Sequence, residues 1–198
     1  MISQTYSATV VPASTTPNPS TWISSDATTA AFMENFARVI RRADLSSWWR
    51  TRGCWKSEIS RIESNFDVIL PGIYVDFLRV MGRSAGAFLS DTRIFISDLT
   101  GIRPRLKRVL DADGGPFHLP KETFVFASRY GDIFYFFDTA DYYDDPPIFA
   151  YKKGSKHIHP VAEGFSTFLL DLLELQRTRR KVKQIPQGHQ LEFLKPAG

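Results

Sequence analysis

The residues of this sequence whose side chains could do chemistry are few, and their spacing indicates no catalytic set. The four histidines are His118, His157, His159 and His189. His157 and His159 alternate along a stretch of strand type and could share a metal ion, but no cysteine or third histidine stands at a ligand spacing. The sequence has no glycine-rich phosphate loop, no Gly-x-Ser-x-Gly and no His-Glu-x-x-His. These residues predict no enzyme, no metal and no cofactor.

Two other features could suggest catalysis, and each has a simpler structural explanation. Cys54 is the one cysteine and has no histidine nearby in sequence, which predicts a small buried or half-buried side chain rather than a reactive thiol. Asp144 and Asp145 could be imagined as a general acid and base. Side chains that are adjacent on a loop seldom reach that geometry, and Pro146 and Pro147 instead indicate a rigid connection.

Residues 138–147 form the stretch that we expect to bind a partner. Its aspartates can accept hydrogen bonds from arginine or lysine, and its tyrosines lose little entropy on docking. Such a loop suits a basic protein partner. The open alternative is a solvated acidic loop without any partner. The candidate partner-binding residues are Asp138, Asp141, Tyr142, Tyr143, Asp144 and Asp145.

The sequence around this loop predicts a meander of β-strands followed by a helix. Residues 123–128 and 133–137 are aromatic and β-branched runs separated by Arg-Tyr-Gly-Asp, which predicts a hairpin with Gly131 at positive φ. Residues 148–153 predict a third strand, which begins after two prolines, and residues 157–161 a short fourth. From residue 163 the apolar period changes to that of a helix lying on a sheet. Its stripe is Phe165, Phe168, Leu169, Leu172 and Leu173.

The first half of the chain predicts further helices and short strands. Periodic apolar residues favour helices over residues 31–42, 57–65 and 71–81. Residues 87–89 and 93–96 are strand candidates. A helix over residues 99–110, capped by Ser97 or Asp98, contains Pro104, so we expect a break there or a start near Arg103.

Two blocks of the sequence resemble the SUKH superfamily, which holds the Smi/Knr-type fungal cell-wall regulators and many bacterial immunity proteins. The first block, residues 59–82, is ISRIESNFDVILPGIYVDFLRVMG. The second is FASRYGDIFYFFDTADYYDDPPIFAYKKGSKHIHPVAEGFSTFLLDLL. The resemblance implies a single α+β domain, with a mainly antiparallel sheet of four to six strands and helices packed against it. It implies no catalytic residue.

Charge and composition divide the chain into four segments. Residues 1–30 are a Ser/Thr/Pro-rich arm that we expect to be mobile, and residues 31–54 an accessory helix with a tryptophan-rich wedge. Residues 55–176 are the SUKH-like domain, and residues 177–198 a basic tail that continues the last helix. Residues 1–54, 55–176 and 177–198 carry formal charges of +2, −3 and +5. The basic character of the chain therefore lies mainly in the tail.

Two segments outside the domain allow a nucleic-acid interpretation. The tryptophans and arginines of residues 46–55 could stack on bases, but such a cluster more often buries its rings where an arm joins a domain. The basic tail could contact phosphates, or it could be a cationic helix end that is favourable against the helix dipole. We expect nucleic acid not to be the main partner.

The resemblance implies a non-enzymatic immunity protein that neutralises a cognate toxin, possibly a nuclease, by occlusion. The alternatives are an intracellular regulatory scaffold of the Smi/Knr kind and a nucleic-acid binder acting through the tail. No apolar run approaches the roughly 18 residues of a membrane span, and the N-terminus lacks a secretory pattern. We therefore expect a cytoplasmic protein that has a protein partner, no small-molecule substrate and no membrane contact.

Overall fold

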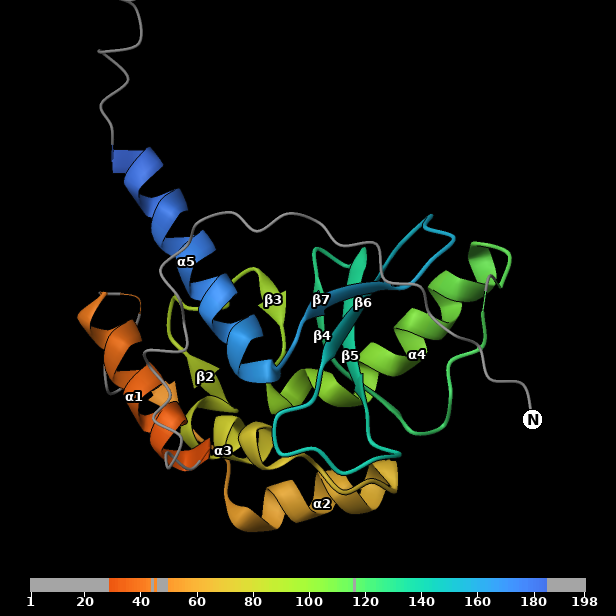
Figure 1. The fold of residues 1–198 in the computed structure, drawn as a ribbon, viewed down its shortest axis with the longest axis horizontal. Helices are drawn as coiled ribbons and strands as arrows, with labels where there is room; N and C mark the ends of the chain where they lie inside the picture. The colour runs from red at the N-terminus through yellow and green to blue at the C-terminus, as the bar shows by residue number, and fades with distance from the viewer. Residues whose placement is uncertain (1–28, 44, 46–49, 116, 185–198) are drawn as a thin grey trace, which may run out of the picture.

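The computed structural model describes residues 29–43, 45, 50–115 and 117–184. It confirms the predicted α+β class, with helices packed against an antiparallel sheet (Figure 1). The predicted arm lies almost wholly outside the described residues, as does the end of the tail. The helices are α1 (Thr29–Arg42), α2 (Lys56–Phe66), α3 (Gly72–Met81), α4 (Ile96–Ala112) and α5 (Phe165–Gln184). The strands are β1 (Thr51–Arg52), β2 (Ser84–Ala85), β3 (Thr92–Arg93), β4 (Thr123–Arg129), β5 (Ile133–Asp138), β6 (Ile148–Lys152) and β7 (His159–Ala162).

The main sheet is a five-stranded antiparallel meander in the order β3-β4-β5-β6-β7. The predicted β4–β5 hairpin is confirmed, with Thr123 opposite Asp138 at its open end and Arg129 opposite Ile133 at its closed end. Its turn takes Gly131 to a φ of 78°, which glycine adopts without steric cost. The two ends of one hairpin therefore fix the positions of two separate surfaces.

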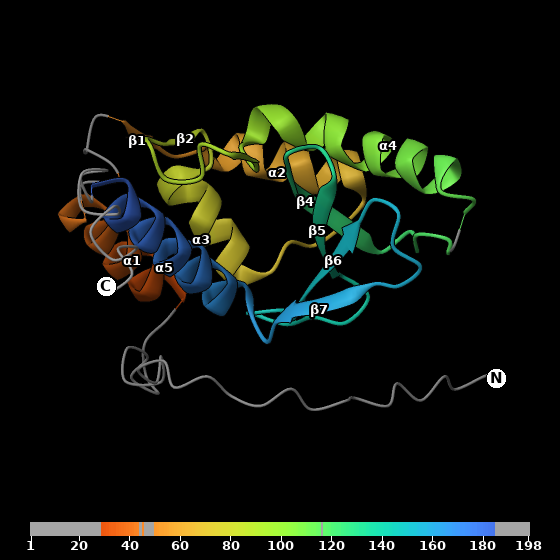
Figure 2. The ribbon, with the colours of Figure 1, turned by 90° about the horizontal axis from the view of Figure 1, so that it is seen from above.

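The core lies on both faces of β4, whose seven residues are all buried. On one face, the Tyr74 ring of α3 contacts Phe124, Phe126 and Phe165, with centroids 5.3–5.8 Å apart. Helix α4 packs along β4 on the side of the sheet away from α5 (Figures 1 and 2). Aromatic pairs in these tilted and edge-to-face arrangements stabilise beyond the area that they bury. The hairpin that carries both surfaces is therefore packed on both sides of β4.

Helix α4 corrects the prediction of a break at Pro104, because it runs unbroken through that residue. Pro104 is exposed, and so is Thr100, whose carbonyl loses its partner in the i→i−4 ladder. Water can therefore satisfy that carbonyl. The predicted caps are also corrected: the helix begins at Ile96, and Asp98 accepts a hydrogen bond from the Phe95 N–H (3.3 Å) from within the first turn.

Two predicted strands differ in the structure. Residues 87–89 form a turn, in which the N–H groups of Ala87 and Phe88 both donate to the Leu45 carbonyl. Phe88 and Leu89 are buried all the same, so their apolar character reflects packing and not a sheet ladder. Of the second candidate, residues 93–96, only Arg93 lies in a strand, as the last residue of β3, and Ile96 already begins α4.

The accessory helix α1 is present, with Met33, Phe36 and Ile40 buried. The Trp55 ring, at the end of the tryptophan cluster of residues 46–55, is not buried, since Trp55 is 72% exposed. Trp55 precedes α2 and donates its N–H to Glu58 Oε2 (2.8 Å), while Cys54 takes the inward position. Trp48 and Trp49 lie outside the described residues.

Candidate functional site

Of the six predicted partner-binding residues, Asp138 ends β5 and the other five lie in the connection to β6, and they do not all have the same role. Asp138, Asp141, Tyr142, Tyr143 and Asp144 are exposed. Asp138 closes a local turn by accepting the Ala140 N–H at 2.8 Å. The loop is therefore an ordered surface feature with several side chains available for contact.

Asp145 is the exception, because its carboxylate is turned toward the protein. It is half-buried, and it accepts both the N–H (3.0 Å) and the hydroxyl of Ser166 in the first turn of α5. A carboxylate at a helix N-terminus satisfies free N–H groups and interacts favourably with the helix dipole. A Cβ at Gly164 would lie 2.7 Å from Asp145 Oδ2, so a glycine is needed for this approach. Asp145 thus anchors the loop to α5.

Asp144 provides a second attachment, to α3. Its carbonyl accepts the Ile73 N–H at 3.0 Å, and its Oδ1 accepts the Tyr142 hydroxyl at 2.8 Å. The bond to this carboxylate raises the pKa of Tyr142, so the phenol remains a neutral hydrogen-bond donor at physiological pH. Backbone and side chain together fix the orientation of the Tyr142 ring.

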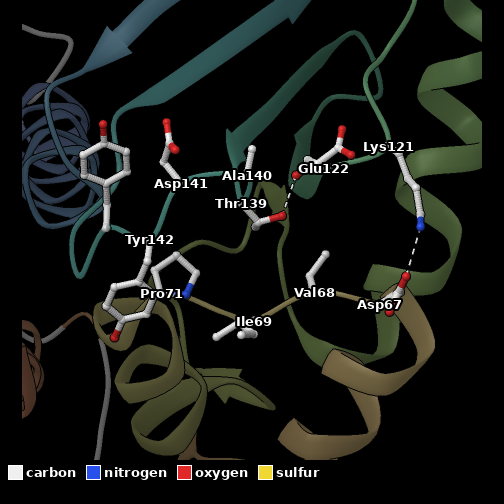
Figure 3. A pocket seen from close by; sticks show the side chains of 11 residues that line it. Asp67, Val68, Ile69, Pro71, Lys121, Glu122, Thr139, Ala140, Asp141 and Tyr142 are labelled. Atoms are coloured by element: carbon white, nitrogen blue, oxygen red, sulfur yellow. Dashed lines mark hydrogen bonds and ion pairs between the residues drawn. The ribbon is translucent and has the colours of Figure 1, made fainter.

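A hollow of about 310 Å³ lies beside the loop, which we call the acidic hollow (Figure 3). The segment that links α2 to α3 forms one wall and the loop after β5 the other. The Thr139 hydroxyl links the loop after β5 to the residue before β4 by donating to the Glu122 carbonyl (2.7 Å). The lining residues are Asp67, Val68, Ile69, Pro71, Lys121, Glu122, Thr139, Ala140, Asp141, Tyr142 and Tyr143.

The large side chains around the acidic hollow are unusually exposed. Ile69 is 72% exposed, Tyr142 67% and Tyr143 52%. Sequence reasoning missed Ile69, although it stands outside the apolar period of α2 and just before the Leu-Pro step, and that position is a signal of exposure. Exposed apolar side chains that cluster and are rimmed by polar groups are typical of interaction sites.

The charges around the acidic hollow are mainly negative. Lys121 is paired with Asp67 at 3.0 Å, and this hydrogen bond raises the pKa of Lys121. Both side chains are largely exposed, so the pair contributes little to stability. Glu122 and Asp141 have no ion-pair partner among the described residues. The surface therefore presents acceptors to a cationic group.

The other candidate groups lie apart from this surface. Cys54 is buried, which confirms the prediction of a buried side chain, and burial raises the pKa of its thiol to about 11. His157 is exposed just before β7, His159 is exposed at its first position, and His159 Nε2 lies 3.0 Å from Ser155 Oγ. Within residues 29–184, excluding the gaps given above, no three His, Cys, Asp or Glu side chains are grouped to hold a metal ion.

No helix in the described part of the chain combines the length and the apolar character that crossing a bilayer requires.

Comparison with known proteins identifies the family. A search of curated proteins finds no match to this chain. The SUKH_6 family model, described as SMI1-KNR4 cell-wall, matches residues 56–169. The match includes α2, α3, the whole five-stranded sheet and the start of α5. The chain therefore belongs to the SUKH family, as its two sequence blocks predict.

Proposed function

We propose that this chain is an immunity protein, which binds a cognate toxin domain in the cytoplasm and covers its active surface without catalysing any reaction. Family membership supports the proposal, since SUKH proteins are commonly immunity proteins and the family is generally non-catalytic. The observation that carries it is the clustering of exposed Ile69, Tyr142 and Tyr143 around one acidic hollow.

The chemistry of this surface favours a basic protein as the partner. A few fully desolvated side chains supply most of the affinity in a protein interface, and tyrosine is enriched among them. Glu122 and Asp141 can accept hydrogen bonds from arginine or lysine, and these bonds are stronger than neutral ones. A nuclease toxin would supply such cationic groups, because its active surface attracts phosphate.

Attachment of the loop favours occlusion by a preformed surface. The bonds of Asp144 to Ile73 and of Asp145 to Ser166 join the loop to two helices of the core. A loop that is already fixed loses little conformational entropy when a partner docks. Of the six candidate residues, we propose direct contact for Asp138, Asp141, Tyr142, Tyr143 and Asp144, and a positioning role for Asp145.

Co-expression of the full chain with the product of the adjacent gene tests this function. The unaltered chain is expected to restore growth and to form a stable pair. The double variant Tyr142→Ala, Tyr143→Ala is expected to weaken the pair by at least about 30-fold, since two interface tyrosines contribute roughly 2 kcal/mol or more. Trp55→Ala is the matched control. It also removes a large exposed ring, but Trp55 precedes α2 and does not line the acidic hollow.

Two results would contradict the proposal. One is a folded double variant that still protects cells and still forms the pair. The other is turnover of a small molecule by the purified chain, which disappears after one point substitution.

A regulatory interaction module of the Smi/Knr kind is the second candidate, favoured by the description of the matched family model as SMI1-KNR4 cell-wall. In that case partner binding should depend on the segments outside the SUKH domain. Truncation of residues 1–28 or 185–198 would then abolish capture of the partner, while Tyr142→Ala, Tyr143→Ala would leave it unchanged.

A further inference from the structure

The closed end of the β4–β5 hairpin carries a second polar cluster, which the proposed function does not use. Asp91 accepts hydrogen bonds at Oδ2 from Arg129 Nε (3.1 Å), the Tyr130 hydroxyl (3.0 Å) and Arg179 Nη1 (3.1 Å). The Arg129 side chain is only 10% exposed. One carboxylate therefore holds together side chains from β4, from the hairpin turn and from α5.

The charge of Asp91 is more than balanced by its surroundings. Burial disfavours the ionised form, but hydrogen bonds from Arg129, Tyr130 and Thr92 outweigh burial and lower the pKa of Asp91. The carboxylate is thus ionised at neutral pH, and two guanidinium groups share its single charge. The cluster as a whole is positive.

A hollow of about 320 Å³ opens beside this cluster, and two further arginines line it. Within the described ranges, neither Arg93 nor Arg105 lies within ion-pair distance of a carboxylate. The Arg105 guanidinium lies against Gly131, in the space that a Cβ would occupy there. The hollow therefore has two guanidinium groups with donors available and a turn that leaves room for one of them.

A second hollow, of about 660 Å³, adjoins the first, and Ser90, Asp91 and Tyr130 line both. Its walls are largely apolar, with Leu89 on one side and Leu172 and Leu175 of α5 on the other. The Tyr130 side chain is 66% exposed where the two hollows meet. A flat ring would find an apolar wall and an aromatic face here, next to Arg93 and Arg105.

We propose that the paired hollows bind a phosphomonoester with a flat aromatic body, of the mononucleotide class. The phosphate is placed between Arg93 and Arg105, whose planar groups match phosphate oxygens in charge and in bidentate geometry. The aromatic body lies beside Tyr130 and along the leucines, where stacking accepts any base. Asp91 lines both hollows, and its bonds to Tyr130 and Arg179 position these two side chains.

Calorimetric titration of the full chain with adenosine monophosphate, adenosine and inorganic phosphate tests this site. Adenosine monophosphate is expected to bind at least about tenfold more tightly than either fragment, because only it fills both hollows. Arg105→Gln and Arg93→Gln should each weaken this binding at least about tenfold. Lys107→Gln is the control, because it removes the same charge from an exposed position of α4 that lines neither hollow.

Several outcomes would overturn the proposal, provided that circular dichroism shows the variants folded. They are absence of binding by adenosine monophosphate, equally tight binding of adenosine or of inorganic phosphate, and an arginine variant that behaves like Lys107→Gln. The Tyr142→Ala, Tyr143→Ala variant should bind adenosine monophosphate as the unaltered chain does, which separates this site from the acidic hollow.

Discussion

The two ends of the β4–β5 hairpin carry surfaces of opposite charge, and each surface contains one acid that serves the fold. At the open end, Asp145 is turned inward to α5, while Asp141 is exposed and has no ion-pair partner in the described part of the chain. At the closed end, Asp91 is the anchor, and Arg93 and Arg105 have no carboxylate within ion-pair distance among the residues that the structure describes. The charge of each surface is thus set by the side chains that are not bonded to its anchoring aspartate. Counting charges along the sequence does not separate anchors from free groups.

The largest expected effect comes from removing the anchor of the arginine end. Asp91→Ala leaves Arg129, whose side chain is 10% exposed, without its carboxylate. Loss of one partner of a buried pair costs about 3–5 kcal/mol, and the partial exposure of Asp91 reduces this to roughly 2–3 kcal/mol in the free energy of unfolding. Urea unfolding measures it. Asp132→Ala, an exposed acid of the same turn, should change stability by less than about 0.5 kcal/mol. Equal losses would show that Asp91 is no anchor.

The same anchor predicts a pH dependence. The pKa of Asp91 is lowered in the folded state, although burial opposes the shift, because Arg129, Tyr130 and Thr92 donate hydrogen bonds to the carboxylate. Its stabilisation is therefore present above the unfolded pKa of about 3.9 and is lost as the pH falls through the lower folded value. The stability difference between the unaltered chain and Asp91→Asn should shrink as the pH falls below about 4. A difference that is constant from pH 7 to pH 3 would contradict this reading.

Removing the anchor of the acidic end should have a smaller effect. Asp145→Ala takes away two hydrogen bonds at the start of α5 and should lower the free energy of unfolding by about 1–2 kcal/mol. Asp141→Ala is the matched control from the same loop. It should leave stability within about 0.5 kcal/mol of the original and weaken partner binding instead. Thermal unfolding measures the stability of both variants, and the pair-formation assay measures their binding. If Asp141→Ala lowered stability and Asp145→Ala only weakened binding, Asp141 would be the anchor and Asp145 the contact residue.

The sequence was sufficient for the elements whose pattern is local. The alternating rings of residues 123–137 and the apolar stripe of α5 predict the hairpin and the closing helix, and both are present. The family resemblance extends this to the whole sheet. The prediction of a helix break at Pro104 was wrong, because the local preference of proline is outweighed by a helix that buries Leu99, Ile102 and Leu106 around it. The two-residue strands β1, β2 and β3 are too short to carry a period at all.

The sites were harder to predict, because their residues meet across long stretches of chain. Ile69 joins the acidic hollow only when the segment before α3 packs beside the loop after β5. The partners of Asp91 are 38, 39 and 88 positions away from it. No periodicity links residues at such separations. The sequence could therefore indicate the acidic loop as a candidate, but not which of its acids is turned inward.

Two glycines with the same backbone conformation, Gly131 and Gly154, test whether Arg105 belongs to the proposed site. Gly131 and Gly154 both have a φ of 78°, but only Gly131 has a neighbour, Arg105, in the space for a Cβ. Gly154→Ala should cost about 1 kcal/mol for the left-handed backbone alone. Gly131→Ala should cost more, by roughly 0.5–1 kcal/mol, because the guanidinium must move, and it should also weaken adenosine monophosphate binding. Equal costs in chemical unfolding, with binding unchanged, would remove Arg105 from the proposed site.

The smallest expected effect tests whether the acidic end is preformed. Tyr142→Phe removes the hydroxyl that donates to Asp144 at 2.8 Å while keeping the ring. Because this bond is exposed to water, stability should change by less than about 0.5 kcal/mol. Association with the partner should nevertheless slow or weaken by a few-fold, because the ring must then be ordered during docking. Surface plasmon resonance resolves such a change, with Tyr6→Phe, in the chain segment far from this loop in sequence, as the control. Unchanged rates would mean that the attachments of Asp144 and Asp145 order the loop without help from the hydroxyl.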